Sequence, residues 1–109
     1  MKRGEIWTQA GGPGYAGKPR PALIVQSDLL TETGSVVTCL FTTRKGAAIP
    51  SRVAITATAA NGLDEDSELM ADKITAVPRV RIGNRVGAVT AEDMDRVEQA
   101  LLLVLGFEP

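Results

Sequence analysis

Two cations alternate with two prolines at the start of an apolar segment of this 109-residue chain. Lys18 and Arg20 each precede a proline, and the residues from Ala22 to Val25 follow. A residue before proline is restricted to extended backbone, so the chain holds both cations stiffly where a core strand begins. A guanidinium fixed in this way suits phosphate, which it can contact with two donors at once. A surface loop whose cations serve solubility would have the same residues, and the segment alone fits both interpretations.

The absence of histidine limits the chemistry of the chain more than any other feature of its composition. The sequence has no His and one Cys, which excludes a Ser-His-Asp triad and a Cys-His pair and makes a transition-metal site improbable. Catalysis has to come from Arg, Lys, Asp, Glu, Thr, Ser or Tyr. Cys39 lies within an apolar run and is predicted to be buried and inert.

Length and charge predict one domain, residues 1–109, with an uneven distribution of charge. The net charge is −1, but residues 1–63 carry seven cations and three acids (7 − 3 = +4), and residues 64–109 carry five cations and ten acids (5 − 10 = −5). A basic N-terminal half could bind a polyanion, unless the two halves interleave in space. No signal peptide and no membrane-spanning run is recognisable, so a cytoplasmic protein is expected.

The apolar pattern predicts a mainly β domain. Strands are expected where apolar and β-branched residues form short runs between turn residues. Gly83 and Asn84 are predicted to form the two-residue turn of a hairpin. The predicted strands cover residues 5–9, 21–27, 36–42, 52–57, 68–75, 80–82 and 85–89.

A single helix is predicted at the C-terminal end. Thr90 is a suitable N-cap with Asp93 three positions later, and Gly106 is expected to end the helix. Leu102 and Leu103 widen its apolar face, which indicates either a deeply buried helix or a second contact surface such as a homodimer interface. The apolar stripe at helical spacing consists of Met94, Val97, Leu101, Val104 and Leu105.

Several other segments have more than one interpretation. Gly12 to Gly17 matches G-x-G-x-x-G, but a strand rather than a helix follows, so a dinucleotide site is rejected. Tyr15 in this loop could stack on an unpaired base or anchor the loop. The acidic run Asp64–Glu68 lacks the ligand spacing of a calcium loop and is predicted to be a solvated turn. Glu5 and Asp72 lie among apolar residues and are each expected to pair with an arginine.

In combination, these motifs resemble the MazF/PemK family of toxins. Each motif is weak alone, but together they follow the family's order over nearly the whole chain. The segments that carry the resemblance are Arg3–Trp7, the Gly-rich loop, Lys18–Pro21, Phe41–Thr43, Gly62–Leu63 with Ser67 and Asp72, and Val86–Val89 before the helix.

The resemblance implies a fold, an activity and partners. The fold is mainly β with a C-terminal helix, an SH3-like small β-barrel of the CcdB/PemK type. The activity is cleavage of single-stranded RNA at specific sequences, without a metal or other cofactor. The RNA's own 2′-hydroxyl attacks the phosphate and leaves a 2′,3′-cyclic phosphate and a 5′-hydroxyl. The partners are a second copy of the chain and a cognate antitoxin that blocks the RNA groove.

Site residues follow from the same resemblance. Arg20 matches the family's catalytic Arg and Thr42 its strand-end Thr, and both would contact the scissile phosphate. Some relatives carry a Glu or a His in the Gly-rich loop and an Arg where this chain has Met70, so the general base is left open. Glu5 and Asp72 match family positions linked to the substrate groove, and the cations Lys18, Arg44 and Lys45 are expected to line the path of the RNA backbone. Tyr15 and Thr43 complete the residues expected to bind RNA.

Two alternatives belong to other functional classes. The segment Val25–Asp28 and the tail Leu103–Phe107 resemble CcdB toxins, which share the fold but poison DNA gyrase without being enzymes. A barrel that binds RNA or a partner without cutting is the other alternative, because the loop acid is missing. Loss of toxicity in Arg20→Ala, but not after deletion of residues 106–109, would favour the nuclease.

Overall fold

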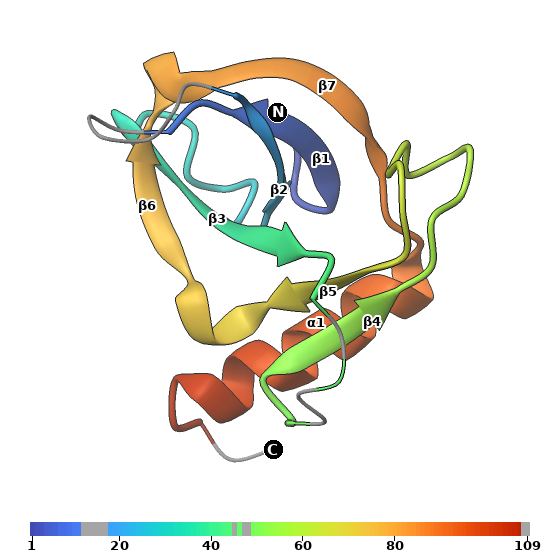
Figure 1. Ribbon diagram of the computed structural model, residues 1–109. Coiled ribbons are helices and arrows are strands. Elements are labelled where there is room, and N and C mark those ends of the chain that lie inside the picture. Colours follow the sequence, from blue (N-terminus) through green and yellow to red (C-terminus); the bar gives the residue numbers. More distant parts are fainter. Residues whose placement is uncertain (12–17, 45, 47–48, 108–109) are drawn as a thin grey trace.

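The computed structural model describes residues 1–11, 18–44, 46 and 49–107, which form a curled antiparallel sheet and one long helix (Figure 1). Every strand pair in the sheet is antiparallel. The elements are β1 (Glu5–Gln9), β2 (Arg20–Ile24), β3 (Ser35–Thr42), β4 (Arg52–Ile55), β5 (Ser67–Met70), the 3-10 turn η1 (Ala71–Lys73), β6 (Thr75–Pro78), the 3-10 turn η2 (Arg79–Arg81), β7 (Ile82–Ala88) and α1 (Ala91–Val104).

The strand order makes β3 the centre of the sheet. The order is β4-β5-β3-β2-β1-β7, and β6 also pairs with β3, on the half of that strand that precedes its contact with β5. The strands curl around, and α1 packs beside β4 and η1 (Figure 1). The sheet is barrel-like without closing fully. The fold class predicted from the sequence, a small β-barrel with a C-terminal helix, is therefore confirmed.

The two faces of β2 and β3 bury two separate groups of apolar side chains. One face, with Leu23 and Cys39, packs in the main core, to which α1 contributes Met94 and Val97. The other face carries a smaller cluster of Ile24, Val36 and Val77, with Trp7 and Ile82 packed against it. The prediction that the second strand is buried on both faces is confirmed, since Ala22, Leu23, Ile24 and Val25 are all buried. The buried parts of both strands are thus packed on both faces, close to the ends that carry Arg20 and Thr42.

The helix begins and ends as predicted. The Thr90 hydroxyl accepts a hydrogen bond from the Asp93 N–H at 3.0 Å, and Gly106 has a φ of +80°, which favours glycine. The apolar stripe is only partly buried: Leu101 lies in the core, whereas Leu105 is exposed. Among the described residues, no helix is long and apolar enough to span a membrane.

The strand prediction from the sequence was wrong in two regions of the sheet. The predicted strand 68–75 is interrupted by η1, which separates β5 from β6. The predicted hairpin turn at Gly83 and Asn84 lies inside the continuous strand β7. Its pairing with β1 shifts register around Trp7, so an irregular strand takes the place of the turn.

Candidate active site

The strand register brings Arg20 and Thr42 together. Ala22 of β2 pairs with Leu40 of β3, so the same register continued by two residues places Arg20 opposite Thr42. Directly opposite residues in an antiparallel pair have their side chains on the same face, with Cβ atoms about 4.5–5.5 Å apart. The hydroxyl of Thr42 thus shares a face with the guanidinium of Arg20, as a joint role at one phosphate requires.

A cavity of about 510 Å³ opens at this point, which we call the Arg20–Thr42 cavity. Among the described residues that line it, the charged ones are all basic: Arg20, Arg44 and Lys73. Several cations around one cavity concentrate positive potential and attract anions. The lining also includes Pro21, Leu40, Phe41, Thr42, Thr43, Ser67 and Met70.

The Thr42 hydroxyl is oriented by the turn that follows β3. Its oxygen accepts a hydrogen bond from the backbone N–H of Arg44 at 3.1 Å. A hydroxyl can accept and donate at once, and within the described residues no acceptor takes its hydrogen. The O–H is therefore available to a bound anion, while the bond from Arg44 holds the oxygen in place.

A second cavity adjoins the first on the other side of Arg20. It measures about 180 Å³ and shares Arg20 and Leu40 with the Arg20–Thr42 cavity. Lys18 and Arg81 also line it, and again the charged residues described there are basic. Arg20 thus stands between two basic cavities, which together make a continuous surface for an anionic chain.

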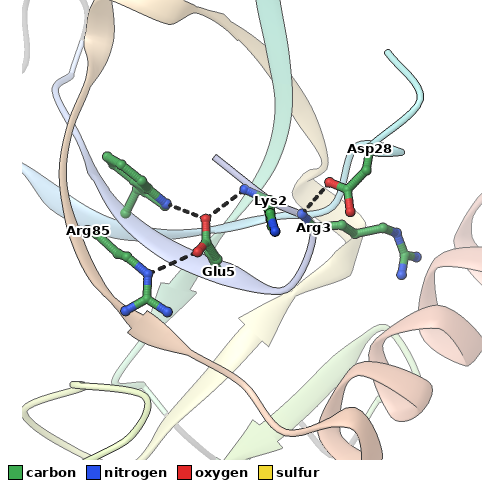
Figure 2. A network of polar contacts seen from close by, with 6 residues as sticks. Lys2, Arg3, Glu5, Asp28 and Arg85 are labelled. Carbon is green, nitrogen blue, oxygen red and sulfur yellow. Dashed lines mark hydrogen bonds and ion pairs between the residues drawn. The ribbon is translucent and has the colours of Figure 1, made fainter. Parts of the chain in front are cut away.

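Glu5 lies in a structural network instead of either cavity (Figure 2). Its carboxylate accepts hydrogen bonds from the Lys2 N–H at 2.6 Å, the Trp7 indole at 3.2 Å and the Arg85 guanidinium at 3.0 Å. Desolvation raises the pKa of Glu5, but these donors, Arg85 first, outweigh it and lower the pKa to about 2. The ion pair expected for Glu5 is confirmed.

The position of Glu5 on β1 separates it from the candidate site. Gln9 is the β1 residue that pairs with Arg20. Glu5 lies four residues earlier on that strand, which is about 14 Å at about 3.4 Å per residue. Its role in RNA binding stays a prediction that the geometry does not bring next to Arg20.

Asp72 is also paired, but beside the cavity. The Arg52 guanidinium donates two hydrogen bonds to its carboxylate, at 2.7 and 3.2 Å. These bonds lower the pKa of Asp72 and raise that of Arg52. The pair confirms the expected ion pair, and it anchors η1 so that the next residue, Lys73, lines the Arg20–Thr42 cavity.

Cys39 is buried and free, as predicted. Desolvation, with a smaller contribution from the Asp72 charge, raises the pKa of its thiol to about 12. The thiol therefore stays protonated at neutral pH and takes no part in the site.

The structure brings together four of the predicted site residues and adds others. Arg20, Thr42, Thr43 and Arg44 line one cavity, and Lys18 lines the adjoining one. Tyr15 and Lys45 lie outside the described residues. The sequence analysis missed Lys73 and Arg81. Both were assigned to strands, and no sequence pattern indicated which face of the sheet their side chains would lie on, whereas the structure places them in η1 and η2.

Comparison with known proteins gives a consistent result. Residues 2–105 match the family of PemK-like, MazF-like toxins of type II toxin–antitoxin systems. The chain is 46% identical to a protein of Mycolicibacterium smegmatis named "Probable endoribonuclease MazF", over 98% of each chain. It is 31% identical to "Endoribonuclease MazF9" of Mycobacterium tuberculosis, over 96% of each chain. A solved structure described as an endoribonuclease in complex with its cognate antitoxin, from a mycobacterial species, superposes with a TM-score of 0.81 and 27% identity, covering 100% of this chain and 98% of that one.

Proposed function

Because the chain belongs to the family of PemK-like, MazF-like toxins of type II toxin–antitoxin systems, we propose that it is an endoribonuclease toxin that cuts single-stranded mRNA at the Arg20–Thr42 cavity. The observation that carries this assignment is that Arg20 and Thr42 line the same basic cavity, at positions that the β2–β3 register, continued by two residues, places opposite each other. Its relatives in the two mycobacteria are named endoribonucleases. These names favour the nuclease over the gyrase poison.

The proposed reaction uses the RNA as its own nucleophile. The 2′-hydroxyl attacks the adjacent phosphorus, the bond to the 5′-oxygen breaks, and a 2′,3′-cyclic phosphate and a 5′-hydroxyl result. Charge accumulates on the non-bridging oxygens in the transition state, and donors aimed at those oxygens lower the barrier. The Arg20 guanidinium can donate to two of them, and the Thr42 hydroxyl, fixed by the Arg44 N–H, can donate to one.

The RNA path follows the basic surface on both sides of Arg20. Arg44 and Lys73 would contact phosphates on the Thr42 side, and Lys18 and Arg81 would do so in the adjoining cavity. The hydroxyl of Thr43 lines the first cavity and would assist there. Glu5 and Asp72 keep the RNA-binding roles that the family resemblance implies, with Asp72 acting beside Lys73. Tyr15 and Lys45 keep the RNA-binding roles expected from their residue types.

The partners and location are proposed from the family. A cognate antitoxin would block the basic surface, as the antitoxin complex of the mycobacterial relative suggests. A second copy of the chain would pack to form a homodimer, and the exposed Leu102 and Leu103 on α1 supply apolar surface for a contact. Residues 1–109 would act as one toxin domain in the cytoplasm, where its mRNA substrate is found.

The first experiment is cleavage of a long, mixed-sequence RNA by the purified protein in EDTA, with the new ends mapped. Discrete cuts that leave 5′-hydroxyl ends, and that disappear in Arg20→Ala, would support the proposal and identify the motif that is cut. Full activity in Arg20→Ala, or loss of activity on adding EDTA, would contradict the mechanism. An absence of cleavage at protein excess over RNA would contradict the nuclease itself, and DNA supercoiling by gyrase would be assayed next.

A further inference from the structure

The proposed reaction needs a group that takes the proton from the 2′-hydroxyl, and this inference rests on that proposed function. The chain has no histidine, and the sequence from Gly12 to Gly17 contains no acid. Arginine is a poor proton acceptor because it stays protonated in proteins. A carboxylate elsewhere in the chain that lies near the phosphate held by Arg20 and Thr42 can take this role.

The two acids that match family positions, Glu5 and Asp72, already accept hydrogen bonds within the protein. Both oxygens of Glu5 accept hydrogen bonds: Oε1 from Lys2 and Trp7, and Oε2 from Arg85 (Figure 2). Both oxygens of Asp72 accept from Arg52. A carboxylate held by a guanidinium in this way is stabilised as the anion and is a weaker proton acceptor.

Glu68 stands next to Thr42 in the sheet. Residue pairing between β3 and β5 sets Thr42 directly opposite Glu68. The register between β2 and β3, continued by two residues beyond the pair Ala22 and Leu40, sets Arg20 opposite Thr42 on the other side. Three adjacent strands therefore present Arg20, Thr42 and Glu68 in one row on one face, with neighbouring strands about 4.7–4.9 Å apart. Met70, two residues beyond Glu68 on the same face of β5, lines the Arg20–Thr42 cavity.

One oxygen of the Glu68 carboxylate is not satisfied within the described structure. Its Oε1 atom is shielded from solvent and has no hydrogen-bond partner among the described residues. A buried polar atom without a partner is costly and calls for an explanation. The nearby Arg52 on β4 is bound to Asp72 instead. Glu68 belongs both to the predicted strand 68–75 and to the predicted solvated turn Asp64–Glu68. The strand is confirmed at this residue and the turn is wrong there, since Glu68 lies in β5 and is only partly exposed.

We infer that Glu68 is the proton acceptor of the cleavage reaction. Its carboxylate takes the proton of the 2′-hydroxyl while the 2′-oxygen bonds to phosphorus. The bond from phosphorus to the 5′-oxygen then breaks, and that oxygen takes a proton from water. The hydroxide left behind removes the proton from Glu68, which restores the carboxylate. Arg20 and Thr42 hold the phosphate between these two proton transfers.

The test compares Glu68→Ala with the matched control Glu65→Ala. Glu65 is an exposed acid three residues earlier, and only its backbone carbonyl is used, by the Ser67 hydroxyl. We expect the single-turnover cleavage rate of Glu68→Ala to fall by at least 10²-fold, as for loss of a general base. Affinity for an RNA with a 2′-deoxy group at the cut site should change less than twofold. Added acetate should restore the rate in proportion to its concentration, and Glu65→Ala should cleave normally.

Three results would overturn the assignment. A rate within threefold of the wild type in Glu68→Ala, with activity lost in Arg20→Ala, would reject Glu68 and leave the proposed function intact. A loss that acetate does not restore, or that comes with a lower Tm or weaker RNA binding, would give Glu68 a structural role only. An absence of cleavage by the wild-type protein would reject the proposed function, and this inference with it.

Discussion

The charged residues of this protein fall into two groups that differ in whether they have a partner. Around Glu5 and along α1, charges are paired: Glu5 with Arg85, Arg3 with Glu98, and Arg96 with Asp93. Around the Arg20–Thr42 cavity and the cavity beside it, the described lining residues include cations without acids. Cations that stabilise the fold are next to carboxylates, whereas those near Arg20 face open space.

This difference separates residues that hold the structure from residues that can bind a ligand. A paired cation has its charge compensated and offers little to an incoming phosphate. A set of unpaired cations repel one another, which destabilises the fold slightly and is relieved when an anion binds. Substitutions in the two groups should therefore affect different quantities: catalysis and RNA affinity in one, stability in the other.

The largest effect is expected for Arg20→Ala. Removing a donor to the transition-state phosphate commonly costs about 10²–10³ in rate. Arg20 is exposed and in no described ion pair, so Tm should hardly change.

The reverse is expected for Arg3→Ala: a lower Tm with a normal cleavage rate. Arg3 bonds to the Val25 carbonyl and to Glu98, and losing these contacts should cost about 1 kcal/mol, or roughly 4–8 °C in Tm.

Cleavage rates and thermal melts of both variants test this contrast. Normal cleavage by Arg3→Ala at a temperature where it is folded completes the expected pattern. If Arg20→Ala instead melts well below the wild type while its rate per folded molecule is unchanged, Arg20 is structural and the division into two groups does not hold.

Thr42→Val should have the next largest effect. The substitution keeps the shape of the side chain but removes the O–H that faces the phosphate and the oxygen that accepts from Arg44. We expect a rate lower by about 10–10²-fold, a weaker effect than for Arg20 because a neutral donor is replaced. Thr42→Ser keeps the hydroxyl and should retain most of the activity. Equal rates for Val and Ser would show that the hydroxyl does not contribute.

Parts of this site could be predicted from the sequence because the relevant signals are local. The Lys-Pro-Arg-Pro segment, the strand end at Thr42 and the helix cap at Thr90 each depend on a few neighbouring residues. The interruption after Met70 could not be predicted, since no Gly or Pro marks it between Glu68 and Thr75. The position of Glu68 opposite Thr42 likewise follows from strand register, which no local pattern specifies.

A smaller effect, on RNA affinity and not on rate, is expected for the unpaired cations away from Arg20. Each phosphate contact with single-stranded RNA adds about 0.7 to the slope of log affinity against log salt. Lys18→Ala and Arg44→Ala should each reduce that slope by about this amount. Arg96→Ala, which removes a cation paired with Asp93, should leave it unchanged. Fluorescence anisotropy with 2′-deoxy-blocked RNA at several salt concentrations measures all three, and an equal loss in Arg96→Ala would mean that net charge alone binds RNA.

The smallest effect concerns stability in acid and tests the paired group directly. The pKa of Glu5 is lowered to about 2 in the folded protein from an ordinary value of 4.5. Between these values the unfolded chain binds more protons, so the contribution of Glu5 is fully present above pH 4.5 and is lost as the pH falls towards 2. Glu5→Gln should lower the free energy of unfolding by on the order of 1–2 kcal/mol above pH 5. The effect is no larger because Arg85 is half-exposed, so solvent screens its attraction to Glu5.

Urea unfolding at pH 3 to 7 should show that the difference in unfolding free energy between wild type and Glu5→Gln narrows in acid. Glu32→Gln, which makes the same charge change at an exposed turn, should show no such difference at any pH. A constant gap for Glu5→Gln would mean that Glu5 stabilises the fold through packing and not through its charge.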